Sequence, residues 1–505
     1  MPSRRDRYRR VAVGLGLTLA LGLGALGWSS TLLGEYSVMD MGGKDMAGGQ
    51  AGHVHGSAAG TGPADGDISV SELIADPLRT PDVRFELVAR RQTVDLPGGR
   101  AVEGYTVNGT SPGPTIRARQ GDLVEVVFLN ESVAAGATLH WHGIDVPNEA
   151  DGVAGITQDA VPPGGRYVYR FIAADAGTYW YHSHQVSHEQ VERGLLGAVV
   201  IDPAVPAADP PAAGPALAGV TTDVVALLHV YAGQHTLNGR VQDEHVAAAP
   251  GATTRIRIIN TDQGTAAVWS ATPFRVIATD GQEVNAPGAV DGKSVLIPAG
   301  GRLDLTMQAP THGSVRLHVG GARSLTIGDP AAAAPSARQP ADALDLLAYG
   351  EPAALEFNPR SPDQTFDYVI GRRPGLIDGR PGNFWTINGR LFPDVPMFHV
   401  GKDDVVVMRI VNETGEVHPM HLHGHHVVVL SRDGKAASGS PWRVDSLDVH
   451  PGESYEIAFV ADNPGIWSGH CHTLPHAVDG LVAHIMYNGV STPFTINGAA
   501  GNHPE

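Results

Sequence analysis

The stretch His470-Cys471-His472, followed by His476, combines the residue types that bind a redox metal, and Cys471 is the only cysteine in 505 residues. A thiolate with two imidazoles is the donor set of copper sites that transfer single electrons. Because side chains alternate between the two faces of a β-strand, Cys471 would face one metal site while His470 and His472 face another. The stretch therefore predicts two metal centres separated by backbone alone. A buried free cysteine beside surface histidines is the alternative for this stretch taken by itself.

Histidine pairs with one residue between them recur in two parts of the chain. They are His140/His142, His182/His184, His421/His423 and His470/His472. With 24 histidines in the sequence about one such pair is expected by chance, so the count is weak evidence, and His53/His55 and His423/His425 are read as chance pairs. Position is the stronger argument, because the four pairs occupy equivalent places in two repeats. Eight imidazoles, four from each repeat, predict a multinuclear metal site between those repeats.

Internal repetition indicates the elements that position these residues. A Thr-x-Asn-Gly turn occurs at residues 106–109, 236–239 and 386–389, each time followed by an alternating strand that ends in Asn. A Pro-Gly segment then leads, with matching spacing, to His182 in the first copy and to His470 in the third, whereas the middle copy reaches His318 without a second histidine. Repeated strands and turns at this spacing predict three β-sandwich domains. We place them at residues 76–203, 204–345 and 362–492, the middle one without copper ligands.

Composition favours a chain rich in short strands. Gly 63 and Pro 37 are many turn formers, and Val-rich alternating runs favour short strands. The net charge of -18 opposes nucleic-acid binding. One cysteine forms no internal disulfide, so stability rests on the core and on bound metal.

The amino terminus resembles a targeting segment. Arginines precede an apolar stretch at residues 11–28, which predicts an export signal or a membrane anchor within residues 1–34. Ser3-Arg4-Arg5 is a partial twin-arginine pattern. We therefore expect an extracytoplasmic protein, secreted or anchored to the outer face of the membrane.

Residues 35–75 are rich in Gly, Ala and Met and are predicted to be a flexible linker. Its Met39, Met41, Met46, His53 and His55 could alternatively hold copper weakly.

The histidine motifs together resemble those of a known family. The strings HWHG at His140, WYHSH at Trp180, HPMHLHGH at His418 and HCHTLPH at His470 are similar to the four copper motifs of multicopper oxidases, in the family's order. The resemblance covers residues 76–490 and implies an all-β fold of three cupredoxin-like Greek-key β-sandwich domains, as in three-domain, laccase-like bacterial members.

The resemblance also implies roles for individual residues. His418, Cys471 and His476 correspond to type 1 copper ligands, and His140 and His421 to type 2 ligands. The type 3 pair would be held by His142, His182, His184, His423, His470 and His472. Members of the family hold four copper ions per chain, oxidise a donor at type 1, and reduce dioxygen to water at the other three.

Three further positions bear on proton delivery and on the redox potential of the thiolate site. Asp151 is similar to the family's acidic residue beside the type 2 copper, which moves protons during oxygen reduction; an ordinary Asp-Gly turn is the alternative. Ala477 stands where many bacterial members carry a second proton-donating Glu. Leu481 stands where blue copper proteins often carry an axial Met, so a site without an axial ligand and with a high potential is expected.

The substrate remains open at this level. Phenols and aromatic amines are the first expectation, and metal ions, Cu(I) above all, are the second. A copper nitrite reductase resembles the repeat but does not need four histidine pairs. A structural homologue that has lost its metals would lack ligands, and no ligand is missing from this sequence.

Overall fold

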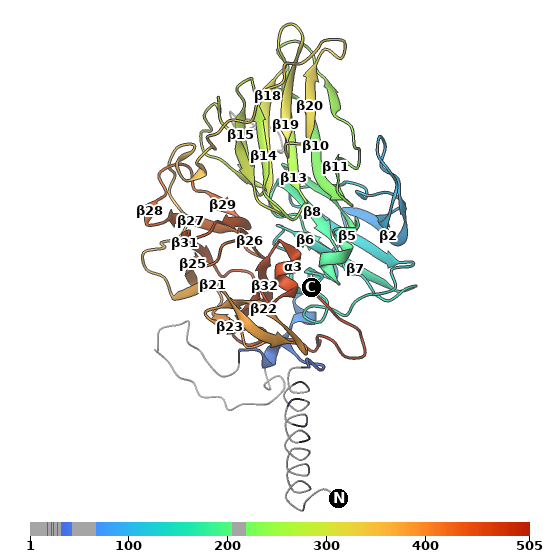
Figure 1. Cartoon of the computed structure of the whole chain (residues 1–505), viewed down its shortest axis with the longest axis vertical. Coiled ribbons are helices and arrows are strands. Elements are labelled where there is room, and N and C mark those ends of the chain that lie inside the picture. The colour runs from blue at the N-terminus through green and yellow to red at the C-terminus, as the bar shows by residue number, and fades with distance from the viewer. Residues whose placement is uncertain are drawn as a thin grey trace, which may run out of the picture.

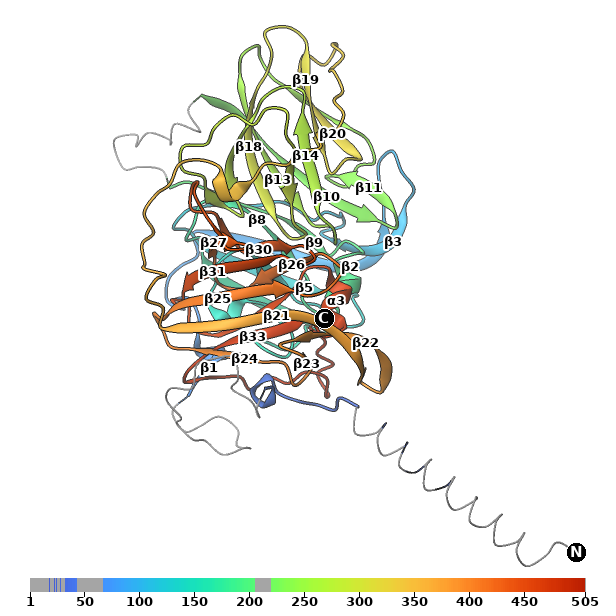
Figure 2. The same cartoon turned by 60° about the vertical axis from the view of Figure 1, so that its left-hand side comes forward.

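The chain folds into three β-sandwich units that pack against one another (Figure 1). The computed structural model describes residues 32–42, 67–204 and 219–504, together with Thr18, Gly22, Gly24 and Trp28. In Figure 1 the second unit lies at the top, the first at the right and the third at the left; Figure 2 shows the second unit resting on the other two. Each unit buries one hydrophobic core between two sheets.

Unit 1 is formed by two four-stranded sheets between residues 83 and 202. One sheet has the order β3-β2-β5-β7 and the other the order β4-β9-β8-β6. The strands are β2 (Val83–Val94), β3 (Val102–Val107), β4 (Ile116–Arg119), β5 (Leu123–Asn130), β6 (His140–His142), β7 (Arg166–Ile172), β8 (Gly177–His182) and β9 (Leu196–Asp202). The short helices η3 (Asn148–Ala150) and α2 (Ser187–Gln190) lie in its connections.

Unit 2 has a six-stranded sheet, β11-β10-β13-β18-β15-β16, and a five-stranded sheet, β12-β20-β19-β14-β17. The strands are β10 (Val220–Tyr231), β11 (Gln234–Leu237), β12 (Glu244–Ala247), β13 (Thr253–Asn260), β14 (Ala266–Ser270), β15 (Arg275–Thr279), β16 (Gln282–Glu283), β17 (Val295–Ile297), β18 (Arg302–Gln308), β19 (Ser314–Val319) and β20 (Arg323–Gly328). A segment with only the short helix η4 (Leu346–Ala348) leads to unit 3.

Unit 3 has one sheet ordered β23-β22-β21-β25-β31-β27-β28, with β29 paired to β27, and a second ordered β24-β33-β32-β26-β30. The strands are β21 (Gln364–Ile377), β22 (Arg380–Ile387), β23 (Arg390–Leu391), β24 (Met397–Val400), β25 (Val405–Asn412), β26 (His418–Leu422), β27 (Val427–Arg432), β28 (Lys435–Ala436), β29 (Arg443–Val444), β30 (Ser446–Val449), β31 (Ser454–Val460), β32 (Ile466–Cys471) and β33 (Val482–Tyr487). Helix α3 (Leu474–Val478) follows β32.

The three units repeat one topology. In each unit the first long strand pairs in parallel with a strand that is not its neighbour in sequence: β2 with β5, β10 with β13, and β21 with β25. Such parallel neighbours require a crossover, which marks a Greek-key connection rather than a simple meander. The prediction of an all-β protein with three β-sandwich units is confirmed.

The repeated Thr-x-Asn-Gly turn has the same physical basis in each unit. Asn108, Asn238 and Asn388 adopt left-handed backbone conformations, with φ of 53°, 51° and 52°. Each side-chain carbonyl accepts a backbone N–H, and each amide donates to a backbone carbonyl two residues before that N–H, at 2.7–2.9 Å. Asn tolerates this conformation better than most residues, and its side chain ties the turn to the first long strand of the unit.

The N-terminal segment differs from the expected linker at both of its ends. Residues 38–40 form the 3-10 helix η1, and residues 68–72 form β1 (Ile68–Ser69) and η2 (Val70–Glu72); β1 pairs with β34 (Val490–Ser491). Val38, Met41 and Val70 are buried in the core of unit 3, and Met39 packs against that core. Two of the three methionines considered as copper ligands therefore serve packing. Met46, His53 and His55 lie outside the described residues.

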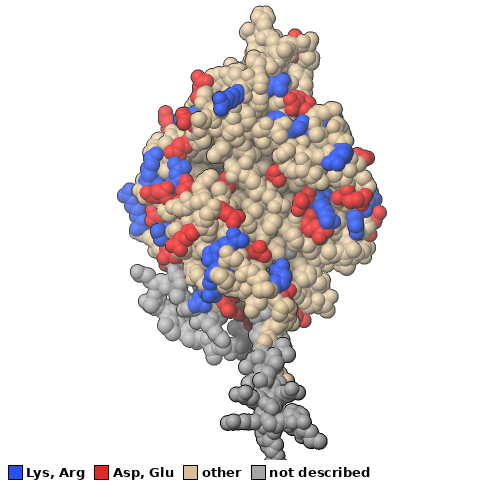
Figure 3. All heavy atoms as spheres, viewed as in Figure 1, with Lys and Arg blue, Asp and Glu red and all other residues tan. Residues whose placement is uncertain are grey.

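On the face drawn in Figure 3, basic and acidic side chains are interspersed rather than gathered by sign. No helix in the described part of the chain is long and apolar enough to cross a membrane.

Candidate metal centre

The four histidine pairs meet where unit 1 and unit 3 face each other. In unit 1, β6 and β8 are antiparallel neighbours that place His140 opposite His182. In unit 3, β26 and β32 place His421 opposite His470. The remaining members of the pairs lie on the same strands or one to two residues beyond them. All eight side chains are buried, with no residue more than 2% exposed: His140, His142, His182, His184, His421, His423, His470 and His472.

The eight imidazoles separate into two groups of three and one pair. His142, His182 and His472 have ligand nitrogens within 4.8 Å of one another, and so do His184, His423 and His470. His140 and His421 remain as a pair that His142 also approaches. Both groups of three draw on units 1 and 3, so neither unit alone could form them. This division matches the type 3 and type 2 sets that the family resemblance implied.

The inner nitrogens of these groups fit a bound cation. Nδ1 of His142 and Nε2 of His182 and His472 are buried without a hydrogen-bond partner, as are Nε2 of His140 and His421. Buried polar atoms without partners are rare in native proteins, and a cation bound at this interface would give all five a partner.

The second group of three, His184, His423 and His470, gives further evidence for a bound cation. Nδ1 of His423 lies 3.1 Å from Asp151 Oδ2, and Nδ1 of His470 lies 3.3 Å from the Cys471 carbonyl, so both outer nitrogens carry the proton. The two Nε2 atoms are therefore lone-pair acceptors, yet they face each other at 3.2 Å. Two acceptors at this distance repel unless a cation lies between them, which is what neutral imidazoles offer a metal.

Burial keeps these imidazoles neutral. The loss of solvation, followed by the neighbouring rings, holds the pKa of His182, His184 and His472 well below its usual range. The same causes act on the pKa of His423 and His470. Neutral imidazole is the form that binds copper, so no proton must be displaced when metal enters.

A separate thiolate site lies within unit 3. Cys471 Sγ is 3.6 Å from Nδ1 of His476 and 3.8 Å from Nδ1 of His418, and the two imidazole nitrogens are 3.2 Å apart. Loss of solvation, together with His476, lowers the pKa of His418 to about 3. One thiolate and two imidazoles at this spacing form a trigonal set suited to a blue copper site.

Strand β32 joins the two sites as its alternation predicted. His470 belongs to one group of three and His472, directly after the strand, to the other, while Cys471 points into unit 3 toward His418. Met420, opposite Cys471 in the neighbouring strand, lies in the core of unit 3 as well. The thiolate is thus one residue away along the backbone from each group of three.

The surface side of the thiolate site carries a carboxylate that the sequence did not single out. Helix α3 carries His476, whose side chain is 16% exposed, and Glu416 Oε2 lies 3.4 Å from His476 Nε2. Arg372 holds Glu416 through an ion pair of 2.7 Å and stacks its guanidinium 4.3 Å from the centre of the Trp385 ring. Trp385 contacts the rings of both His418 and His476. The spacing of Glu416, two residues before His418, was the available signal.

Asp151 lies beside the cluster, as the resemblance implied. Its Oδ1 is 3.0 Å from His140 Nδ1, and its Oδ2 is 3.1 Å from His423 Nδ1. The carboxylate therefore touches one histidine of the pair and one of a group of three. Among the described residues no Lys or Arg forms an ion pair with Asp151.

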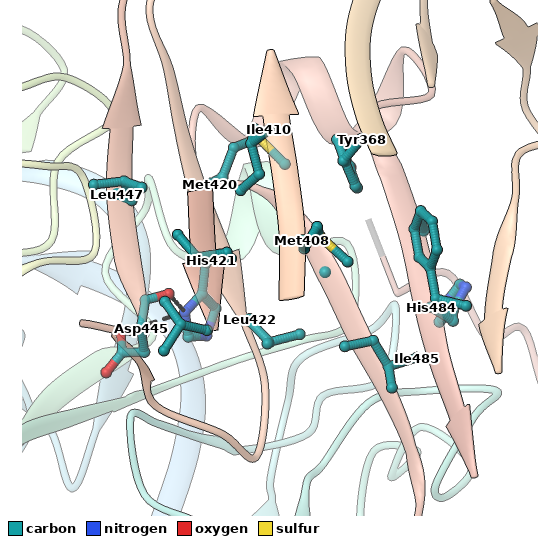
Figure 4. Close-up of a pocket in the computed structure, with 15 residues that line it drawn as sticks. Tyr368, Met408, Ile410, Met420, His421, Leu422, Asp445, Leu447, His484 and Ile485 are labelled. Atoms are coloured by element: carbon teal, nitrogen blue, oxygen red, sulfur yellow. Dashed lines mark hydrogen bonds and ion pairs between the residues drawn. The ribbon is translucent and has the colours of Figure 1, made fainter. Parts of the chain in front are cut away.

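A second aspartate, Asp445, was missed from sequence. Its Oδ1 lies 3.2 Å from His142 Nε2 and 3.4 Å from His421 Nδ1, and its backbone carbonyl accepts from His421 Nδ1 at 2.8 Å. Figure 4 shows His421 and Asp445 joined in this way. Burial opposes ionisation, but Arg302 of unit 2 outweighs it and holds the pKa of Asp445 well below its usual range. An isolated Asp in a loop carries no spacing signal.

His426 extends this charged group to all three units. Its Nδ1 lies 3.5 Å from Asp145 of unit 1 and its Nε2 lies 3.5 Å from Asp445. Burial alone would lower the pKa of His426, but the two carboxylates outweigh it and raise that pKa to about 9. His425, by contrast, bonds the His423 carbonyl and the Tyr487 hydroxyl, so it is not directed at the cluster.

The remaining predicted positions lie around α3. Ala477 and Leu481 are both buried, and the Leu481 carbonyl accepts a hydrogen bond from the Cys471 N–H at 3.1 Å. The Asp479 carbonyl accepts from the Trp385 N–H. The segment from His476 to Leu481 thus closes around Cys471 by backbone hydrogen bonds.

A cavity of about 50 Å³ lies inside unit 3 between its two sheets (Figure 4). Met408, Met420 and Ile485 are among its mostly apolar lining residues. A cavity that holds a benzene ring is on the order of 150 Å³, so this one is a void of the core and does not admit an aromatic donor.

Comparison with known proteins gives one family. A multicopper oxidase family model matches residues 88–205, and a second matches residues 372–489. The chain is 28% identical over 460 residues to Multicopper oxidase MmcO of Mycobacterium tuberculosis, covering 80% of this chain and 87% of that protein. It is 28% identical over 493 residues to Laccase-1 of Botryotinia fuckeliana, covering 83% of this chain and 84% of that protein.

A solved structure agrees with these relatives. The crystal structure of a multi-copper oxidase from Pseudomonas thermotolerans superposes with a TM-score of 0.64 at 27% identity, covering 80% of this chain and 99% of that one. The two ranges matched by the family models contain all eight cluster histidines and the three residues of the thiolate site.

Proposed function

Because this chain belongs to the multicopper oxidase family, an oxidoreductase family with oxygen as acceptor, we propose that it oxidises small phenols or aromatic amines at the Cys471 site and reduces dioxygen at the histidine cluster. The observation that carries the proposal is the sequence His470-Cys471-His472, whose members belong to three different donor groups. Bound copper ions, one for each of four donor groups, supply the one-electron oxidation and the four-electron reduction. In one full reaction cycle, four phenols and one dioxygen give four phenoxyl radicals and two waters.

Glu416 has a role in this reaction that follows from its position. A phenol that gives up an electron also releases its hydroxyl proton, and a nearby carboxylate that accepts this proton assists the transfer. Glu416 lies at the exposed edge of His476, and Arg372 fixes its orientation. A donor hydroxyl or amine bound there would face the carboxylate and the imidazole at once.

Asp151 serves the opposite end of the reaction. Formation of two waters consumes four protons, and Asp151 is a buried carboxylate in contact with histidines of two donor groups. Because a proton can be held on its carboxyl oxygens within the interface, Asp151 is suited to deliver protons there.

The variant Glu416→Gln tests the donor site. The kcat/KM for a phenol should fall about 100-fold or more, since the amide accepts no proton. Oxidation of ferrocyanide, which gives up an electron and no proton, should not fall. Glu413→Gln is the matched control, because Glu413 is an exposed glutamate of the same loop. Equal kcat/KM values for the phenol in both variants would remove the role of Glu416, and a chain that binds no copper would remove the function.

A metal-ion oxidase is the second candidate, favoured by the same carboxylate. An exposed Glu beside His476 offers an oxygen ligand to a metal ion as readily as an acceptor to a phenol. The burial of Met41 and the packing of Met39 in unit 3 remove part of the support that these residues lent to Cu(I). Turnover on a phenol compared with Fe(II), which accepts carboxylate oxygen ligands, and with Cu(I), which prefers sulfur ligands, distinguishes the candidates.

We also propose that the protein acts outside the cytoplasm. The support is the arginine-rich start and the apolar stretch at residues 11–28, which has the composition of an export signal or anchor. Cell fractionation of the full chain, beside a chain lacking residues 1–34, tests this: the shortened chain should remain in the cytoplasm.

A further inference from the structure

Unit 2 contributes none of the eleven candidate copper ligands, yet one of its side chains reaches the cluster's surroundings. Arg302, the first residue of β18, is 2% exposed. Its Nη1 and Nη2 donate to the two carboxylate oxygens of Asp445 at 2.6 and 2.5 Å. The remaining donors reach the carbonyls of Thr178 at 3.2 Å, Asp280 at 3.1 Å and Gly300 at 3.4 Å. The guanidinium is therefore fixed on every side.

The other side of Asp445 faces two candidate ligands. Its Oδ1 lies 3.2 Å from His142 Nε2 and 3.4 Å from His421 Nδ1. The two rings stack with their centres 3.7 Å apart and an angle of 11° between their planes. One carboxylate oxygen thus lies beside a histidine of unit 1 and a histidine of unit 3 that belong to different donor groups. The Ser446 hydroxyl, 3.1 Å from His142 Nε2, and the Asp445 carbonyl, 2.8 Å from His421 Nδ1, complete the contacts of the two outer nitrogens.

The backbone is shaped around this arrangement. Gly143 directly follows His142 and has a φ of +83°, which L side chains rarely adopt. A Cβ at Gly143 would overlap the Arg302 guanidinium and the Asp445 carboxylate. The glycine of the HWHG string is therefore the residue that lets the ion pair approach His142.

We propose that Arg302 is a positioning residue of the copper cluster: its two-point hydrogen bond fixes the plane of the Asp445 carboxylate, and that carboxylate orients His142 and His421. The proposal rests on the proposed function. A bidentate guanidinium–carboxylate pair restrains rotation as well as distance, which a lysine ammonium does not do. With the outer nitrogens held by Asp445, the inner nitrogens of both rings remain free to bind metal. Unit 2 then has a part in the cluster although it holds none of the candidate copper ligands.

Arg257 provides a matched control within the same unit. It lies on β13, is 1% exposed, and forms a bidentate ion pair of 2.8 and 2.8 Å with Asp223. Like Arg302 it crosses to unit 1, through the Thr178 hydroxyl at 2.9 Å. Within the described part of the chain, Arg257 contacts neither a cluster histidine nor Asp445. A loss caused only by removing a buried arginine that joins unit 2 to another unit should therefore appear in variants of both arginines.

The experiment compares Arg302→Met, Arg302→Lys and Arg257→Met in the copper-loaded full chain. Each protein is dialysed against a series of chelator concentrations to determine its copper affinity. Copper content, the type 2 EPR signal and the blue absorption are measured at each concentration. In Arg302→Met the affinity of the type 2 site should fall by up to about 100-fold, because the variant releases Asp445, and loss of an outer partner of a metal-binding histidine costs about 10- to 100-fold. The blue absorption and the type 1 potential should not change. Arg302→Lys should recover part of the affinity, and Arg257→Met should lose thermal stability with normal type 2 copper.

Two results would overturn the proposal: wild-type type 2 affinity and EPR parameters in Arg302→Met, or an equal loss of type 2 copper in Arg257→Met. If Arg302→Met does not fold, Arg302→Lys decides alone, because it retains the charge and loses the two-point geometry. Wild-type type 2 copper in Arg302→Lys would then contradict a positioning role. Absence of any copper cluster in the wild-type protein is a separate outcome that contradicts the proposed function itself.

Discussion

The histidine cluster and the thiolate site are built in opposite ways. The cluster combines eight buried imidazoles from units 1 and 3, and no single unit holds a complete group of three. The thiolate site takes all its donors from unit 3, and the edge of His476 is exposed beside Glu416. The origin of the donors therefore decides how far each site is exposed to solvent. An interface between two cores shields the cluster from large molecules, whereas the thiolate site reaches the surface through the edge of His476.

The largest effect is expected from removing the thiolate. Cys471→Ser should abolish the blue absorption and the oxidation of every donor, because a hydroxyl is a hard, weak ligand for copper. The eight cluster histidines are unchanged in this variant, so the cluster should still bind copper. Visible absorption, cluster EPR and copper per chain measure the result. Blue colour in the variant would contradict the assignment of the thiolate site.

A variant of the histidine cluster serves as the control for Cys471→Ser. His182→Asn removes one donor from a group of three and leaves Cys471, His418 and His476 in place. The blue band should persist and be bleached by a donor, but dioxygen should no longer restore it. Equal behaviour of the two variants would mean that the sites do not divide the reaction.

The next largest effect is expected on the rate at which dioxygen reoxidises the histidine cluster. Asp151→Asn removes a carboxyl proton carrier without removing a candidate copper ligand. Reoxidation by dioxygen should slow by about 100- to 10,000-fold, the usual contribution of general acid catalysis. The amide retains only one acceptor oxygen for the two histidines, so the comparison uses protein loaded with excess copper, in which copper content and reduction of the blue site by a donor should remain normal. Stopped-flow reoxidation measures this, and an unchanged rate would leave Asp151 as an ordinary turn residue.

A smaller effect is expected where the three units meet. His426 has a folded pKa of about 9, above its ordinary value of about 6.5, because Asp145 and Asp445 favour the charged form. Its stabilisation is therefore fully present below pH of about 6.5 and is lost as the pH rises through about 9. Thermal unfolding at pH 7 and pH 10 should show a larger decrease in Tm for the wild type than for His426→Gln. Equal decreases would show that His426 is not charged in the folded protein.

The smallest effect concerns the potential of the thiolate site. A thioether stabilises oxidised copper, so Leu481→Met should lower the potential and slow the oxidation of high-potential phenols. The volume changes little, and stability should change by less than about 1.5 kcal/mol. Redox titration of the blue band in both proteins measures the difference. An equal or higher potential would show that Leu481 is not in the axial position.

Much of the fold was predictable because its signals are local. The Asn of each Thr-x-Asn-Gly turn needs a left-handed backbone and bonds within about twenty residues of its own position, so the turn leaves a repeated sequence pattern. The opposite orientations of Cys471 and its two histidine neighbours likewise follow from strand alternation, a property of the backbone itself. The linker was predicted less well, because Met41 is buried by unit 3 residues more than three hundred positions away.

The donor types, their pairing along strands and the three repeats can all be recognised from residue spacing. Which imidazoles share a group depends instead on how unit 1 and unit 3 face each other, and spacing does not record that. The same holds for the contacts around the cluster. Arg302 and Asp445 are ordinary residues 143 positions apart, and only the packing of three units brings them together behind His142. Buried charges must find partners wherever the fold places them, and no local pattern records that requirement.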